Sequence, residues 1–426
     1  MRLRSRGDGR HGGGRTPLLA VRAGRPTLVR VRAIALALLI LVATAGGASA
    51  AVPADLSEDP LDRGVLLALP SVYRVKTTIR VDAIRLADGR VLKMPAQGRN
   101  IPEVGTAVAV TPDGWLVTAA HVAAPTPETV ARLAYQTREA FAQRPHADEQ
   151  AARDWVARNG AEAVPGTVTS TVITPANVGV EPQDEKVYQG MDRRPSPTAD
   201  LALVRIPVQG APALALDDAR SKGTPIATIG FSGDDRLMTG AGAPGEATVR
   251  RGVIRLNGTL EPESPEARPG LIVSAGVQSG DSGGPVVDED GALRGIVIQR
   301  SDTGGGFAET ASEVRELMEQ EGLEPQAGPS AEAFRTAMAA LWRLDLGDAE
   351  SGFARTLSAY PSHGLASREL ARSRELAASP FALRADDRRE GILLGVAVLA
   401  NVAAAAGAFA LARPALGRAR GGAGGR

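Results

Sequence analysis

The chain has 426 residues, of which 43% are hydrophobic, 23% charged and 3% aromatic, and its formal net charge is +1. This length accommodates two or three domains with buried cores. The absence of cysteine excludes disulfide scaffolds, thiolate zinc sites, cysteine nucleophiles and iron–sulfur clusters. No two of the four histidines have the HExxH spacing, so no metal site is expected, and the near-neutral charge gives no support to a nucleic-acid partner.

Residues 1–50 have the pattern of a secretory signal peptide. Nine arginines and a single acid, Asp8, precede a stretch of nineteen uncharged residues, 33–51. The small residues Ala48, Ser49 and Ala50 predict cleavage after Ala50. An uncleaved anchor is the alternative, because a stretch of this length nearly spans a hydrocarbon core of roughly 30 Å.

A second apolar stretch, residues 391–412, is predicted to be a transmembrane helix. Its 22 residues carry no charge, and the tail 413–426 has four arginines and no acid. The positive tail predicts a cytoplasmic C-terminus, with residues 52–390 on the outer side of the membrane. A buried core helix is the alternative.

Residues 70–322 are predicted to form one mainly β domain after an N-terminal linker, residues 51–69. Short runs rich in Val, Ile, Leu and Thr are separated by Gly, Pro or Asp pairs, which is typical of a β-barrel or sandwich. The runs are residues 73–81, 105–110, 115–118, 201–206, 226–229, 252–256, 271–274, 285–287 and 293–299. A helical insertion is predicted over residues 125–160, with Thr126 as N-cap and Pro127 at the first helical position.

Residues 310–321 and the segment from Ala331 onward have helical periodicity. We expect a helical hairpin or linker over residues 323–390. Residues 329–362 also have the length and order of one tetratricopeptide repeat, but a single repeat cannot bury its own apolar face. A plain hairpin is therefore favoured.

The segment Gly280-Asp281-Ser282-Gly283-Gly284-Pro285 indicates a nucleophile loop. Flanking glycines allow a tight turn that presents the serine hydroxyl, and the amides of Gly280 and Ser282 can converge as an oxyanion hole. His121, at the end of a predicted strand, is the candidate base. Asp200, at the start of an apolar strand, is the candidate residue to orient the imidazole.

The blocks TAAHV, ADLALV and GDSGGP, in the order His, Asp, Ser, resemble the signature blocks of the trypsin-like serine endopeptidases. The resemblance covers about residues 70–321 and is closest to the bacterial HtrA-type branch, supported by the segments 69–75, 223–231 and 304–309, although no PDZ-like domain follows. It implies two six-stranded β-barrels, with His121 and Asp200 on the first and Ser282 on the second. Together with the insertion, the C-terminal helices and the transmembrane helix, these barrels make up the predicted fold.

Besides the missing PDZ-like domain, two features depart from that family. The interval from His121 to Asp200 is long because it contains the insertion. Asp281 stands where HtrA-type members typically have asparagine; in digestive relatives this aspartate pairs with a newly cut N-terminal ammonium, and nothing near Arg63 clearly provides one. Whether an activation step is needed stays open.

The resemblance also places the substrate. It puts Gly276 at the base of the pocket for the residue before the scissile bond, where a glycine supplies no charge. We therefore expect no preference for Arg or Lys, and favour small or medium apolar residues. Ile298, Gln299 and Arg300 correspond to the edge along which substrate backbone adds as a strand, and Arg300 is expected to narrow the pocket or attract an acidic residue.

The sequence thus predicts a membrane-anchored, extracytoplasmic serine endopeptidase that acts on proteins or peptides through His121, Asp200 and Ser282 and an acyl-enzyme. No metal or cofactor is needed for that chemistry. The alternative is a catalytically silent protease-fold module that docks a membrane partner. The oligomeric state and the physiological substrate stay open.

Overall fold

The computed structural model describes residues 59–142, 149–164, 167–175, 186–218, 221–231, 247–260, 268–301 and 304–378. By backbone contacts the chain divides into residues 1–53 and residues 54–426, and every described residue belongs to the second unit. The predicted signal peptide, the transmembrane helix 391–412 and the basic tail lie outside the described residues. Within the described ranges, no helix combines the length and apolarity that crossing a bilayer requires.

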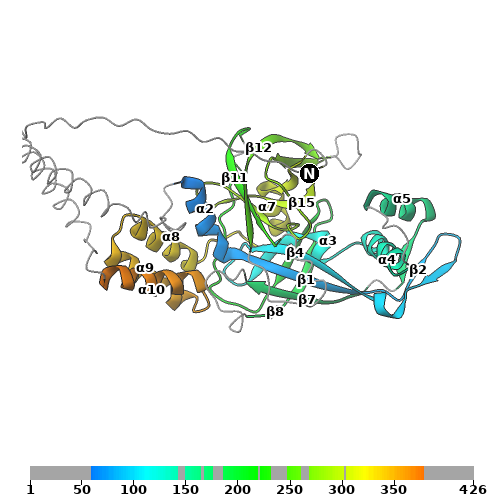
Figure 1. Ribbon diagram of the computed structural model, residues 1–426, viewed down its shortest axis with the longest axis horizontal. Coiled ribbons are helices and arrows are strands. Elements are labelled where there is room, and N and C mark those ends of the chain that lie inside the picture. The colour runs from blue at the N-terminus through cyan, green and yellow to red at the C-terminus, as the bar shows by residue number, and fades with distance from the viewer. Residues whose placement is uncertain are drawn as a thin grey trace, which may run out of the picture. The chain divides into compact units, whose positions relative to one another are not determined.

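The first sheet contains seven strands (Figure 1). In spatial order they are β8 (Tyr188–Gln189), β7 (Thr167–Pro175), β1 (Val72–Arg80), β4 (Asn100–Ala109), β5 (Trp115–Ala119), β10 (Leu201–Arg205) and β9 (Met191–Pro195). The expected six-stranded barrel is corrected here to a nearly closed seven-stranded sheet. Its edge strands β8 and β9 are separated in sequence only by Gly190, and no ladder joins them in the described part of the chain.

The second sheet is the closed six-stranded barrel that was expected. Its strands are β11 (Pro225–Gly230), β12 (Thr248–Leu260), β13 (Arg268–Val273), β16 (Gly306–Thr310), β15 (Leu293–Arg300) and β14 (Pro285–Val287). Helix α7 (Ala311–Gln320) follows β16 directly, because Thr310 and Glu313 form a reciprocal capping box.

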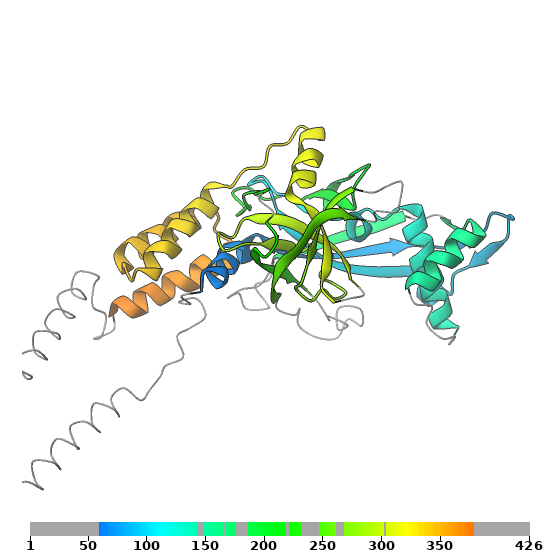
Figure 2. The same cartoon turned by 90° about the horizontal axis from the view of Figure 1, so that it is seen from above.

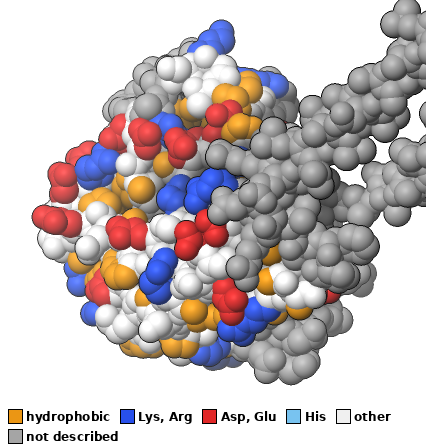
Figure 3. All heavy atoms as spheres, turned by 90° about the vertical axis from the view of Figure 1, so that its left-hand side faces the viewer, with side chains coloured by type: hydrophobic (Ala, Val, Ile, Leu, Met, Phe, Trp, Pro, Cys, Tyr) orange, Lys and Arg blue, Asp and Glu red, His pale blue; other side chains and the backbone are white. Residues whose placement is uncertain are grey.

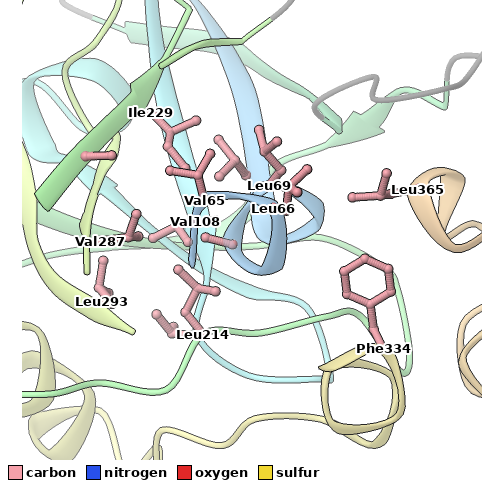
Figure 4. Close-up of a cluster of buried hydrophobic side chains, with 14 of the residues drawn as sticks. Val65, Leu66, Leu69, Val108, Leu214, Ile229, Val287, Leu293, Phe334 and Leu365 are labelled. Atoms are coloured by element: carbon pink, nitrogen blue, oxygen red, sulfur yellow. The ribbon is translucent and has the colours of Figure 1, made fainter. Parts of the chain in front are cut away.

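Residues 60–68, expected to be linker, form helix α2 (Pro60–Ala68), which leads into a 3-10 turn, η2 (Leu69–Ser71). The Asp59 side chain accepts a hydrogen bond from the Leu61 amide, and Pro60 occupies the first helical position. Leu61 is buried, and Val65 and Leu66 lie in a core that the helix shares with both sheets and the C-terminal helices (Figure 4). A helix of nine residues is too short for its apolar period to be recognised in the sequence.

The insertion is helical, as predicted. Thr126 caps α4 (Pro127–Phe141) by accepting from the Thr129 amide, and α5 (Glu149–Asn159) ends just before Gly160. These helices pack with a small sheet of β3 (Val91–Lys93), β2 (Ala83–Arg85) and β6 (Glu162–Val164), beside the 3-10 turn η3 (Ala96–Gly98). This group shares an apolar cluster with Ile79 of β1 and Ile101 of β4, distinct from the other core clusters. In both views it lies at the end of β1 opposite to α2 (Figures 1 and 2).

Three helices follow α7. The expected hairpin over residues 329–362 is present as α8 (Pro329–Trp342) and α9 (Leu346–Ala359), and a third helix, α10 (Gly364–Ala378), packs on α9. Gly352 allows α8 and α9 to approach closely, since a Cβ there would meet the Ala337 Cβ at 2.7 Å. The side of the molecule that carries these helices has acidic and basic side chains interspersed on its described surface (Figure 3).

His363 caps α10 from inside this helical group. Its Nδ1 accepts a hydrogen bond from the Ala366 amide at 3.1 Å, and its ring lies 4.5 Å from that of Phe334. The side chain is buried, and Nε2 has no hydrogen-bond partner among the described residues. Burial lowers the pKa of His363 from 6.5 to about 4.

We predict that this histidine makes the protein less stable in acid. The unfolded chain takes up the proton near pH 6.5 and the folded chain does not until about pH 4. The histidine's contribution is therefore complete above pH 6.5 and is lost as the pH falls, by about 2 kcal/mol between pH 7.5 and pH 5. Chemical denaturation at both pH values should show this loss. His363→Asn keeps a capping acceptor without a titrating ring, so it should remove that part of the pH dependence; an unchanged dependence would contradict the assignment.

Candidate active site

His121 and Asp200 are brought together by the pairing of β5 with β10. The two strands are antiparallel with Leu201 opposite Ala119, so the end of β5 lies beside the start of β10. His121 is in the short helix α3 (Ala120–Ala123), whose first amide, that of Ala120, donates to the Asp200 carbonyl at 3.1 Å. Adjacent strand ends therefore place a histidine and a carboxylate that are 79 positions apart in the sequence.

The Asp200 carboxylate holds His121 at two points. Oδ2 lies 2.7 Å from His121 Nδ1, and Oδ1 accepts the His121 amide at 3.0 Å. With a proton on Nδ1 directed at the carboxylate, Nε2 carries the lone pair. This is the tautomer that a general base requires.

The environment raises the pKa of His121. Burial acts to lower it, but the negative charge of Asp200 and the hydrogen bond to its carboxylate raise it by more. Glu103 adds a smaller raising effect and Arg132, on α4, a smaller lowering effect. The inserted helix α4 therefore contributes a positive charge that acts on the pKa of His121.

Ser282 lies in a loop whose backbone conformation depends on glycine. Gly280 and Gly283 have φ values of +93° and +86°, which side chains with a Cβ rarely adopt. The amides of Asp281, Gly283 and Gly284 donate to the carbonyls of residues 278, 297 and 281. In contrast, the amides of Gly280 and Ser282 have no acceptor among the described residues. The loop thus leaves free the two amide donors that were expected to form an oxyanion hole.

Thr106 on β4 joins this loop to the first sheet. Its amide donates to the Ser282 carbonyl at 2.8 Å, and its hydroxyl donates to the Gly280 carbonyl at 2.9 Å. Gly283 permits this approach, because a Cβ there would lie 1.9 Å from the Thr106 carbonyl oxygen. The loop of the closed barrel is therefore fastened to the sheet that carries His121 and Asp200.

The Ser282 hydroxyl donates to the Ile298 carbonyl on β15 at 3.4 Å, and not to His121, in the described structure. Ile298 is buried, while Gln299 and Arg300 at the end of β15 are exposed. Gly276 is exposed, and a Cβ there would meet only Arg250 Cδ, at 3.7 Å. A side chain at position 276 would thus meet only the aliphatic part of Arg250.

Three residues with contacts at this site were not singled out in the sequence. Thr106 binds the loop, and Arg250 on β12 donates to the Asp281 carboxylate at 2.8 Å. Glu309 on β16 accepts the Asp200 amide at 3.1 Å and is completely buried. A glutamate in the apolar end of a strand is the one local signal that could have indicated a buried polar role.

Across the part of the chain that the structure describes, no group of three or more His, Asp or Glu side chains is placed to hold an ion. The groups described at this site can perform proton transfer, nucleophilic attack and hydrogen bonding to an oxyanion.

Several solved serine protease structures are similar at low sequence identity. The Rv3671c protease from M. tuberculosis in its active form is 18% identical, with 75% of this chain and 96% of that one covered and a TM-score of 0.39. The serine endoprotease from Yersinia pestis is 17% identical, with 62% and 67% covered and a TM-score of 0.37. The HtrA-type protease AlgW with tripeptide is 21% identical, with 61% and 64% covered and a TM-score of 0.37. These TM-scores are too low for the structural similarity to support a conclusion about this chain.

Comparison with protein families is more informative. No curated protein matches the sequence. The family described as the trypsin-like peptidase domain matches residues 105–296, a range that includes His121, Asp200 and Ser282. This match confirms the trypsin-like resemblance of the three sequence blocks. Residues 105–296 therefore match a trypsin-like peptidase domain, and this match supports a serine endopeptidase of the trypsin-like type.

Proposed function

We propose that the protein hydrolyses peptide bonds through an acyl-enzyme on Ser282. His121 takes the hydroxyl proton as Ser282 attacks the carbonyl carbon, and later returns a proton to the leaving amine. Asp200 orients the ring and stabilises the imidazolium. The observation that carries this proposal is the two-point hold of Asp200 on His121, at 2.7 and 3.0 Å, because it leaves Nε2 as the base.

The amides of Gly280 and Ser282 complete the proposal. A tetrahedral intermediate places negative charge on the former carbonyl oxygen, and pre-oriented amide donors stabilise it. The other amides from 281 to 284 are already hydrogen-bonded, so these two can donate without breaking a contact. Thr106 holds the carbonyls of the same two residues and so limits the rotation of this loop.

Ser282 has to turn from the Ile298 carbonyl toward His121 for attack. The hydrogen bond to be given up is long, 3.4 Å, and rotation about one side-chain bond moves the hydroxyl without changing the backbone. The hydrogen bonds that align a nucleophile with its base often tighten only when substrate is bound. The alternative, a silent binding module, requires that this rotation never occurs.

The substrate is a protein or peptide. We propose that Gly276 lies at the base of the pocket, that the pocket favours small or medium apolar residues, and that substrate backbone lies along Ile298, Gln299 and Arg300. The exposure of Gly276 and the absence of a carboxylate from its contacts support this preference. We further propose that residues 391–412 anchor the enzyme outside the cytoplasm, on the charge pattern of the sequence.

Replacing the nucleophile tests the proposal most directly. Ser282→Ala should abolish labelling of the full-length chain by a fluorophosphonate and lower kcat/KM for peptides by at least about 10⁴-fold, because no covalent intermediate can form. Ser279→Ala, a serine three positions earlier in the same loop, is the matched control and should label like wild type. Hydrolysis that persists in Ser282→Ala would reject the assignment, and a folded wild type that never labels would favour the binding module.

The pH dependence of kcat/KM tests the His121–Asp200 pair. His121 must be neutral to accept a proton, and its pKa is raised, so activity should fall on the acid side with a midpoint above 6.5. Asp200→Asn removes both raising effects of Asp200, so the midpoint should move to lower pH and kcat at neutral pH should fall about 10⁴-fold. An acid limb that stays in place in Asp200→Asn would show that another group controls it.

Truncation tests the anchor. A chain that ends at Ser379 should leave the membrane fraction after cell disruption, while its fluorophosphonate labelling rate stays within about twofold of the full chain, because the site lies in residues 105–296. Removing only residues 413–426 is the control and should leave the protein with the membrane. Retention of the shorter chain would assign membrane binding to another segment.

A further inference from the structure

The nucleophile loop contains a buried carboxylate next to its reactive serine. Asp281 lies between Gly280 and Ser282, and only 3% of its side chain is exposed. A buried carboxylate is costly unless positive charge and hydrogen bonds compensate for the lost water. The groups that pair with the Asp281 carboxylate therefore also help to set the backbone conformation of Gly280 and Ser282.

The compensating cation comes from the barrel wall. Arg250 Nη1 donates to Asp281 Oδ2 at 2.8 Å, and the Gln278 amide donates to the same oxygen at 2.9 Å. Arg250 is itself mostly buried, with 21% of its side chain exposed. It lies on β12 opposite Thr228 of β11, so its backbone is held within a closed sheet. The charge is thus supplied by a rigid strand.

Backbone hydrogen bonds on both sides of Asp281 stabilise the nucleophile loop around the Arg250–Asp281 pair. The Asp281 amide donates to the Gln278 carbonyl at 3.1 Å, and the Gly284 amide donates to the Asp281 carbonyl at 2.8 Å. Gly230 leaves room for the carboxylate, because a Cβ there would lie 2.6 Å from Asp281 Oδ1. Both the side chain and the backbone of Asp281 are therefore engaged, and the Ser282 amide beside it has little freedom.

We infer that Arg250 is a positioning residue that holds the Asp281 loop in the hydrolytic arrangement, so that the loop needs no cation from elsewhere, such as a newly cut chain terminus. The inference rests on the proposed function and deepens it by naming what orders the loop. It also links two parts of the site, because the aliphatic stem of Arg250 lies beside Gly276. The order of the nucleophile loop is established when the barrel folds.

A double-mutant cycle on the full-length chain tests this. Arg250→Met removes the cation that pairs with the Asp281 carboxylate, and the fluorophosphonate labelling rate should fall roughly a hundredfold, the scale of losing one oxyanion-hole donor. Asp281→Asn together with Arg250→Met removes both charges and should label at least about tenfold faster than Arg250→Met alone. Arg251→Met, the neighbour on the same strand that pairs with Asp59 at the surface, is the matched control and should label within about twofold of wild type.

Hydrogen exchange of residues 276–287 gives a second readout that does not need activity. Exchange in this segment should be faster in Arg250→Met and unchanged in Arg251→Met. Wild-type labelling and exchange in folded Arg250→Met would overturn the inference while the proposed function stands. If Arg250→Met does not fold, the double variant decides: a folded, labelled double variant supports the inference, and an unfolded or unlabelled one overturns it. Loss of labelling in wild type itself would instead refute the proposed function.

Discussion

The contact between strand β4 and the nucleophile loop is the constraint on which the site depends. His121 and Asp200 belong to the seven-stranded sheet, and Ser282 belongs to the closed barrel. The amide and hydroxyl of Thr106 bind the carbonyls on both sides of Asp281. Gly283 and Gly105 let the two backbones meet, because a Cβ at Gly283 would lie 1.9 Å from the Thr106 carbonyl oxygen and a Cβ at Gly105 would lie 2.7 Å from the Ser282 carbonyl oxygen. A side chain at Gly283 would therefore push apart the two segments that place the nucleophile beside its base.

Carboxylates with protein partners define the electrostatics around that contact. The Asp200 carboxylate accepts from the ring and the amide of His121, the Asp200 amide donates to Glu309 of the other sheet, and the Asp281 carboxylate accepts from Arg250 and the Gln278 amide. Removing a carboxylate from water costs several kcal/mol unless such partners are in place. These partners come from different elements, so each carboxylate is compensated only when its own sheet has formed. The ionised groups that take part in the reaction are therefore stabilised only in the folded protein.

The outer elements affect the site to different degrees. The insertion shares an apolar cluster with Ile79 of β1 and Ile101 of β4 and reaches the site through the charge of Arg132, which lowers the pKa of His121 slightly. Helix α2 and the C-terminal helices share a core with the barrel and the first sheet, so they contribute to the stability of both. The cap of α10 depends on a buried neutral histidine, so the stability of this helical group depends on pH separately from the titration of His121.

Much of the site could be predicted from the sequence because its signals are local. The nine apolar runs all lie in or overlap observed strands, Thr126 and Pro127 mark the start of α4, and the glycines around Ser282 indicate a strained turn. Such features depend on periodicity, capping and backbone sterics, which act within a few residues. The trypsin-like match over residues 105–296 agrees with the three blocks.

Only the tertiary structure decided the rest, because it depends on residues distant in the sequence. The short strands β2, β3, β6, β8 and β9 have two to five residues and form by pairing, so no period in the sequence marks them. Helix α2 is stabilised by a core contributed by other segments. Asp281 pairs with Arg250, 31 positions earlier, within the closed barrel, and the Asp200 amide pairs with Glu309, 109 positions later, across the contact between the two sheets. The sequence by itself determined which groups carry the chemistry. The three-dimensional packing determined which groups hold them in place, because burial and charge compensation exist only once distant segments have packed together.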